Sequence, residues 1–105
     1  KPLVLLINER CYSDAEIFPA GWKQLELGPV VGETTFGAVI GTSDVTLVDG
    51  TGFRVPSTGW FTLSGENLEN TGVEPDIHVP EMPADAGQNI DRQLESAATI
   101  IREML

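Results

Sequence analysis

The chain has 105 residues, enough for one small domain with a core and too few for two. Its hydrophobic share of 41% and charged share of 21% are those of an ordinary globular protein. Sixteen acidic side chains against six basic ones give a formal net charge of −10. Such a surface repels phosphate backbones and anionic lipid, so no nucleic-acid partner is expected. No apolar run reaches the roughly 20 residues of a membrane span, so no membrane insertion is expected either.

The first third of the chain predicts a strand–helix–strand unit. Residues 3–7 are continuously apolar, which is typical of a strand buried on both faces of a parallel sheet. Ser13 can cap a helix over residues 14–27, in which Pro19 predicts a kink or a late start. Residues 30–31 predict the second strand. The unit therefore implies a right-handed parallel crossover and an α/β fold.

The rest of the chain alternates short apolar segments with turn residues. Asp49-Gly50 is a strong hairpin signal. The pattern predicts short strands at 45–48, 52–55, 59–63 and 77–79, a loop at 66–76, a connector at 80–87 and an amphipathic helix within 90–105.

Ser13 is the most informative position for chemistry. A serine at a strand-to-helix junction can present its hydroxyl at the rim of a sheet, beside the unpaired N–H groups of the first helical turn. Such amides can stabilise an oxyanion by roughly 3–4 kcal/mol per well-placed donor. On these grounds alone a helix cap is the commoner role for Ser13-Asp14, and a nucleophile is the alternative.

Four segments in series alter that balance. They are Ser13-Asp14-Ala15-Glu16, the Val-Gly-Glu-Thr-Thr-Phe-Gly segment at 31–37, the Glu-Asn-Thr-Gly-Val-Glu-Pro-Asp-Ile segment at 69–77, and the helical segment at 91–97. In this order they resemble the S41 serine peptidases, which comprise the C-terminal processing (tail-specific) proteases and the tricorn proteases. The resemblance implies an α/β fold of the ClpP/crotonase-like kind. Residues 1–105 would then be the C-terminal portion of the catalytic domain, with its upstream part absent.

The resemblance also implies roles for individual residues. Ser13 would be the nucleophile, and the backbone N–H of Asp14 would form half of the oxyanion hole. Ala38 stands where the processing proteases carry the lysine of a Ser-Lys dyad, and an alanine cannot accept a proton. Glu69 matches the glutamate that supports the catalytic histidine in the tricorn branch, so the chain is expected to lie closer to that branch. The histidine and the second oxyanion donor would lie outside this chain.

Other residues are candidates for the same catalytic roles. Glu66 and Glu74 are rivals of Glu69 within the same loop. His78, the only histidine, is expected to be a surface residue of an edge strand rather than a general base. Lys23 is expected to keep its head in water and so not to replace the missing dyad lysine.

No cofactor or metal site is predicted, because one histidine and one cysteine offer no ligand spacing. Cys11 is expected to be a buried, inert thiol, and Trp60 and Phe61 to pack in a core. The expected function is amide hydrolysis on peptides or protein C-termini through an acyl-enzyme, with this chain inactive by itself. A non-catalytic peptide-binding or structural module on the same fold is the alternative. Homo-oligomerisation, cleavage specificity and compartment stay open, with Ala38 pointing to the mostly cytosolic tricorn branch.

Overall fold

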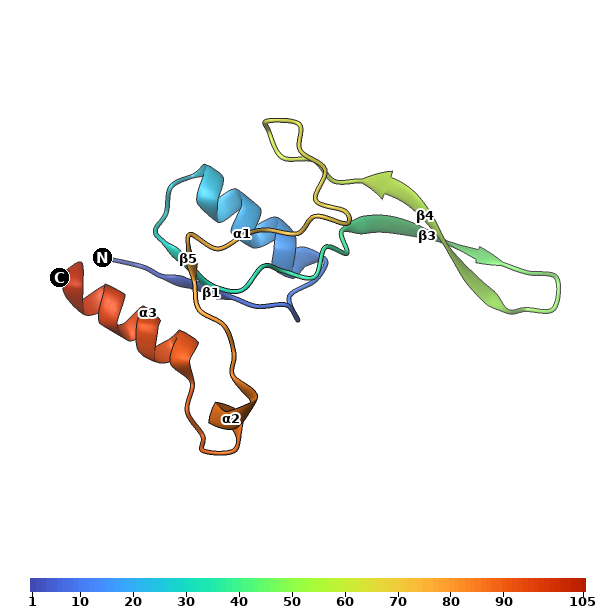
Figure 1. The fold of residues 1–105 in the computed structure, drawn as a ribbon. Helices are drawn as coiled ribbons and strands as arrows, with labels where there is room; N and C mark the ends of the chain where they lie inside the picture. Colours follow the sequence, from blue (N-terminus) through green and yellow to red (C-terminus); the bar gives the residue numbers. More distant parts are fainter.

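The computed structural model describes residues 1–105 and shows an α/β fold, as predicted (Figure 1). In chain order the elements are β1 (Leu5–Ile7), α1 (Asp14–Gln24), β2 (Val30–Gly32), β3 (Ile40–Thr46), β4 (Gly52–Gly59), β5 (Ile77–His78), α2 (Pro83–Ala86) and α3 (Arg92–Glu103). None of the helices has the length and apolar character needed to cross a bilayer.

A three-stranded parallel sheet in the order β1-β2-β5 lies at the centre of the fold. Ile7 of β1 pairs with Gly32 of β2, and Val31 of β2 pairs with Ile77 of β5. α1 connects β1 to β2, and Figure 1 places α1 and α3 on opposite sides of these strands. Covered on both faces, Val30 and Val31 are fully buried, as the apolar runs predict.

α1 begins at Asp14 and continues through Pro19, which is buried. The late helix start considered for Pro19 is wrong, because the Glu16 N–H already donates to the Ser13 carbonyl at 2.8 Å. The apolar face of α1 packs, through Ile17 and Ala20, on a small cluster formed by Val39, Leu68 and Val73. This packing fixes α1 against the loop after β2 and the loop before β5.

β3 and β4 form an antiparallel hairpin that projects away from the sheet (Figure 1). The predicted turn at Asp49-Gly50 is confirmed: Gly50 has φ 85° and the Thr51 N–H donates to Asp49 Oδ1 at 2.9 Å. The hairpin is longer than predicted, since pairing extends from this turn to Ile40 and Gly59.

The predicted strand at 59–63 is wrong. Phe61 forms only an isolated bridge with Asn67, because the chain turns back on itself there. Trp60 and Phe61 are 46% and 63% exposed, so the prediction that they pack in a core is also wrong.

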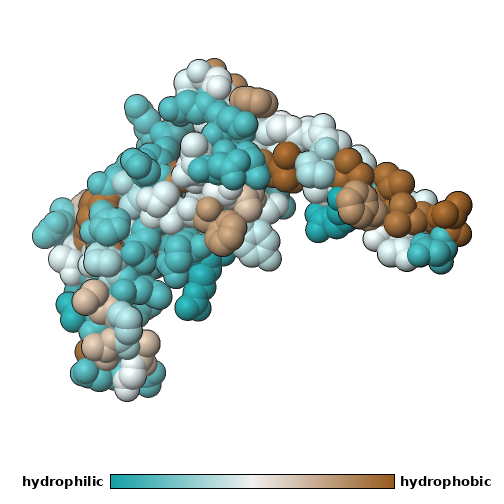
Figure 2. Space-filling view, turned by 45° about the vertical axis from the view of Figure 1, so that its right-hand side comes forward, coloured by the Kyte–Doolittle hydropathy of each residue, from teal (hydrophilic) through white to brown (hydrophobic).

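The molecule is extended for its length. Its radius of gyration is 17.2 Å, against about 13 Å for a compact chain of 105 residues. Its accessible surface is 7390 Å², against about 5,700 Å² for a compact monomer of this mass. The hairpin strands are exposed along most of their length, and Figure 2 shows apolar side chains running to the tip. The exposed apolar residues there include Val45, Leu47, Val48 and Phe53.

The C-terminal segment covers one face of the sheet. α2 is a single turn inside the stretch predicted to be a plain connector. α3 lies within the predicted helix and packs on β1 and β2. Its N-cap is Asp91, whose side chain accepts from the Leu94 N–H at 2.9 Å.

Candidate active site

Ser13 lies between β1 and α1 in an unusual backbone conformation, with φ 57° and ψ −124°. A non-glycine residue in such a region costs about 1–3 kcal/mol and persists only where its surroundings hold it. Here its N–H donates to the Ala38 carbonyl at 2.9 Å, and its own carbonyl accepts from the Glu16 N–H.

The side chain of Ser13 is exposed and makes no capping hydrogen bond. Ser13 therefore occupies the N-cap position without capping through its hydroxyl, and the simple helix-cap interpretation is wrong. The sharp turn directs the side chain away from the first-turn amides that a capping serine would engage. Its hydroxyl forms no hydrogen bond within the chain.

The backbone N–H of Asp14 is free as well. The N–H groups of its neighbours Ser13, Ala15 and Glu16 all donate to backbone carbonyls, whereas that of Asp14 donates to no acceptor in the chain. It lies at the first position of α1, where the helix dipole places partial positive charge. A free amide beside an exposed hydroxyl is the arrangement that can hold a developing oxyanion.

Glu69 is half-buried, and its Oε2 accepts from the Val39 N–H at 2.5 Å. The same peptide unit, between Ala38 and Val39, offers its carbonyl to the Ser13 N–H. Ser13 and Glu69, 56 positions apart in sequence, thus bond to the two ends of one peptide unit. Glu69 Oε1 has no partner within the chain and could orient another group.

The two rival carboxylates do not share this position. The side chain of Glu66 is exposed and contacts Ser64 at 3.5 Å. Glu74 is exposed, and only its backbone carbonyl is used, by Lys23. Glu69 is the one of the three that bonds to the segment holding Ser13.

The Lys23 side chain stays 34% exposed, but its ammonium is bonded to the protein rather than free. Its Nζ donates to the Glu74 carbonyl at 2.7 Å and lies 2.9 Å from Asp76 Oδ1. Burial would raise the pKa of Asp76, but the Lys23 ammonium and the Val30 N–H lower it below its ordinary value. Lys23 follows Ser13 by ten helical positions, about 15 Å along α1, so it cannot act as the base.

His78 is an exposed residue of the edge strand β5, as predicted, with Nε2 4.0 Å from Glu33 Oε1. Cys11 is half-buried rather than buried, and its Sγ lies 3.5 Å from the Asn8 N–H. No three His, Cys, Asp or Glu side chains come close enough together to hold a metal ion.

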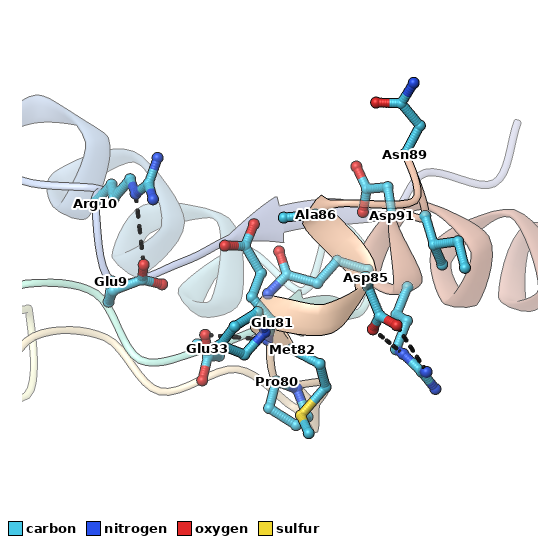
Figure 3. Close-up of a pocket in the computed structure, with 14 residues that line it drawn as sticks. Glu9, Arg10, Glu33, Pro80, Glu81, Met82, Asp85, Ala86, Asn89 and Asp91 are labelled. Carbon is cyan, nitrogen blue, oxygen red and sulfur yellow. Dashed lines mark hydrogen bonds and ion pairs between the residues drawn. The ribbon is translucent and has the colours of Figure 1, made fainter.

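A cleft of about 630 Å³ opens at the carboxyl ends of the parallel strands (Figure 3). Glu9 follows β1, Glu33 follows β2 and Glu81 follows β5, so the cleft is strongly acidic. Neither Ser13 nor Glu69 lines it. It is separate from the candidate active site.

Two ion pairs neutralise part of this cleft. Arg10 lies 3.6 Å from Glu9, and Arg92 is paired with Asp85 through both Nε and Nη2 (Figure 3). The hydrogen bonds from Arg92 hold the pKa of Asp85 below its ordinary value, against a smaller opposing effect of burial. This pair ties α2 to the start of α3.

Glu16 is the residue that sequence reasoning missed. It appears in the sequence only as the last residue of the Ser13-Asp14-Ala15-Glu16 segment, yet it is fully buried and accepts three hydrogen bonds. Its spacing of three from Ser13 fits a capping box, in which the glutamate bonds back to the N-cap N–H. The structure uses the residue differently, because the Ser13 N–H is taken by Ala38.

The geometry and the sequence both match a known class of hydrolase. The model of peptidase family S41 matches residues 1–79, and the chain belongs to that family. Tricorn protease homolog 1 of Streptomyces coelicolor is 43% identical over 94% of the chain and 10% of that protein. The tricorn protease of Thermoplasma volcanium is 38% identical over 95% of the chain and 10% of its own length.

A crystal structure of the tricorn protease superposes with a TM-score of 0.87 at 33% identity, over 97% of this chain and 10% of that one. The resemblance to the S41 family and its tricorn branch is thus confirmed, and with it the predicted fold. The chain spans about a tenth of the length of these relatives.

Proposed function

We propose that residues 1–105 are the nucleophile-bearing portion of the catalytic domain of a serine peptidase that cleaves peptides or protein C-termini. Ser13 is the nucleophile, the Asp14 N–H is one oxyanion donor, and Glu69 supports a histidine supplied by a segment outside this chain. The carrying observation is Ser13 itself: a strained turn leaves its hydroxyl exposed and uncapped beside a free amide.

In the proposed reaction the Ser13 hydroxyl oxygen bonds to the scissile carbonyl carbon while its proton passes to the histidine. The carbonyl oxygen becomes an oxyanion held by the Asp14 N–H. The C–N bond then breaks, the histidine protonates the leaving amine, and water hydrolyses the acyl-enzyme. Glu69 Oε1, which has no partner in the chain, stabilises the charged histidine.

The test uses the full-length protein that contains this chain. A fluorophosphonate should label Ser13, as mapped by mass spectrometry, and Ser13→Ala should lower kcat for peptide hydrolysis by at least about 10⁴-fold. Ser57→Ala, on the exposed hairpin, is the matched control and should retain both labelling and activity. Peptidase activity that survives Ser13→Ala would refute the proposal and favour the non-catalytic binding module.

Glu69 can be tested separately from its rivals. Glu69→Gln removes the negative charge that supports the histidine and should lower kcat by about 100-fold or more. Glu66→Gln, in the same loop with an exposed side chain, should change kcat by less than about 2-fold. The reverse result would move the supporting role to Glu66.

A further inference from the structure

We propose that Glu16 is a positioning residue for this reaction: its buried carboxylate holds the N–H of Ala38, and the next peptide unit, between Ala38 and Val39, bonds to both Ser13 and Glu69. The inference rests on the proposed function of Ser13. It concerns a side chain that contacts neither of the reacting groups directly.

The carboxylate of Glu16 lies in a closed environment within the protein. Glu16 is 0% exposed and forms no ion pair with any lysine, arginine or histidine. A buried charge without hydrogen bonds is very costly, so its partners are fixed by necessity. Oε1 accepts from Thr35 Oγ1 at 2.5 Å and from the Gly37 N–H at 2.6 Å, and Oε2 accepts from the Ala38 N–H at 2.8 Å.

All three partners are donors, so the position fits a carboxylate. The Thr35 hydroxyl donates a hydrogen bond to Glu16 and accepts one from the Val73 N–H at 2.7 Å, which settles its orientation. The segment from Thr35 to Ala38 has no regular secondary structure. The N–H groups of its first two residues donate to backbone carbonyls, and those of Gly37 and Ala38 donate to Glu16. The carboxylate therefore holds the second half of the segment.

Ala38 and Val39 link the Glu16 carboxylate to Ser13 and Glu69. The N–H of Ala38 bonds to Glu16, and its carbonyl accepts the Ser13 N–H. The next N–H along the chain, that of Val39, donates to Glu69. The Glu16 N–H also donates to the Ser13 carbonyl at 2.8 Å. Ser13 is thus held on both sides by Glu16, directly through its backbone and indirectly through its side chain.

The consequence concerns geometry rather than binding. If the 35–38 segment shifts, the strained turn at Ser13 loses the acceptor that holds its N–H, and the hydroxyl leaves its reactive position. A displacement of about 1 Å costs on the order of 100-fold in rate. Contacts that bind substrate away from Ser13 need not change, so the effect should fall on kcat.

Glu16→Gln in the full-length protein tests the proposal. The variant keeps the size of the side chain but turns one of its two terminal atoms into an NH₂ donor, which must face a donor. At a temperature where both proteins are folded, kcat and the rate of Ser13 labelling by a fluorophosphonate should each fall about 100-fold, with KM within about 2-fold. Glu103→Gln, exposed at the end of α3, is the control and should match the wild type.

A second pair of variants decides the matter if Glu16→Gln does not fold. Thr35→Val removes one of the three donors and should lower kcat about 10-fold, and Thr35→Ser, which keeps the hydroxyl, should restore most of the loss. A folded Glu16→Gln or Thr35→Val protein with kcat within about 2-fold of wild type, or with a loss confined to KM, overturns the positioning role. Survival of activity in Ser13→Ala would instead refute the proposed function, so the two failures are distinguishable.

Discussion

Gly32 lies where β1 and β2 approach most closely, and replacing it with alanine should destabilise the fold severely. Its φ is +132°, and an added Cβ would lie 1.8 Å from the Ile7 carbonyl oxygen, which is backbone and cannot rotate away. That oxygen accepts the Glu33 N–H at 3.0 Å. Relieving the clash must therefore separate the paired strands or break this bond.

The magnitude follows from these two costs. The backbone strain of a side chain at this φ is about 1–3 kcal/mol, and losing the buried hydrogen bond adds about 1–3 kcal/mol. Gly32→Ala should thus lower the free energy of unfolding by about 2–6 kcal/mol, a large part of the 5–15 kcal/mol typical of a domain.

Urea denaturation followed by tryptophan fluorescence measures this loss. Gly21→Ala is the matched control, because a Cβ there meets nothing within 4 Å and alanine favours a helix interior over glycine. It should raise the free energy of unfolding by about 0.5–1 kcal/mol. A Gly32→Ala protein within about 1 kcal/mol of wild type, with an unchanged denaturant slope, would refute the reasoning.

Three further predictions concern single contacts. The pKa of Asp76 is lower in the folded chain, so its pairing with Lys23 stabilises the fold above the ordinary pKa of 3.8, and this stability is lost as the pH falls through the folded pKa. Asp76→Asn should therefore lower the free energy of unfolding by up to about 1 kcal/mol at pH 7. In acid titrations the variant should show a flatter dependence of stability on pH below about pH 4. The pKa of Asp85 is lowered by Arg92, so the same sign applies: Asp85→Asn should lower the melting temperature at pH 7 and reduce the further loss between pH 4 and pH 2. Trp22→Phe removes an indole N–H bond of 2.8 Å to a backbone carbonyl and should cost about 1 kcal/mol in a circular-dichroism melt; no change would mean that water replaces it.

The parallel sheet could be predicted because its signals are local. The apolar runs that contain Ile7, Val31 and Ile77 each mark a strand by themselves, and a strand–helix–strand unit has one favoured handedness and pairing. The hairpin turn at Asp49-Gly50 was likewise local. The strand ends were not, since pairing along β3 and β4 extends as far as both strands stay extended, through Ser, Thr and Gly positions with little apolar signal.

The candidate site could be predicted in part. Ser13 was located by its place at a strand-to-helix junction and by the order of the motifs around it. Its uncapped side chain could not be foreseen, since the unusual φ depends on an acceptor 25 positions away, at Ala38. The role of Glu16 was hidden for the same reason, because its partners are 19 to 22 positions further along the chain.

Errors about side-chain partners have a related cause. The position of Lys23 on a helix predicts a free ammonium, but its carbonyl partner Glu74 lies 51 positions further on, beyond the reach of any local sequence pattern. Trp60 and Phe61 err in the opposite direction. Hydropathy indicates that such rings favour burial, and does not say whether the same chain supplies the cover.

Under the proposed function, the backbone conformation of Ser13 trades folding stability for a reactive hydroxyl. Glycine adopts φ 57° without the steric penalty that serine carries, so Ser13→Gly should relieve strain while removing the hydroxyl. A library randomised at this position and sorted for heat resistance alone should therefore enrich glycine. The same library sorted for covalent labelling should return serine. Comparing the residues enriched by the two selections at this one position would thus show how much folding stability the protein gives up to hold a hydroxyl at this turn.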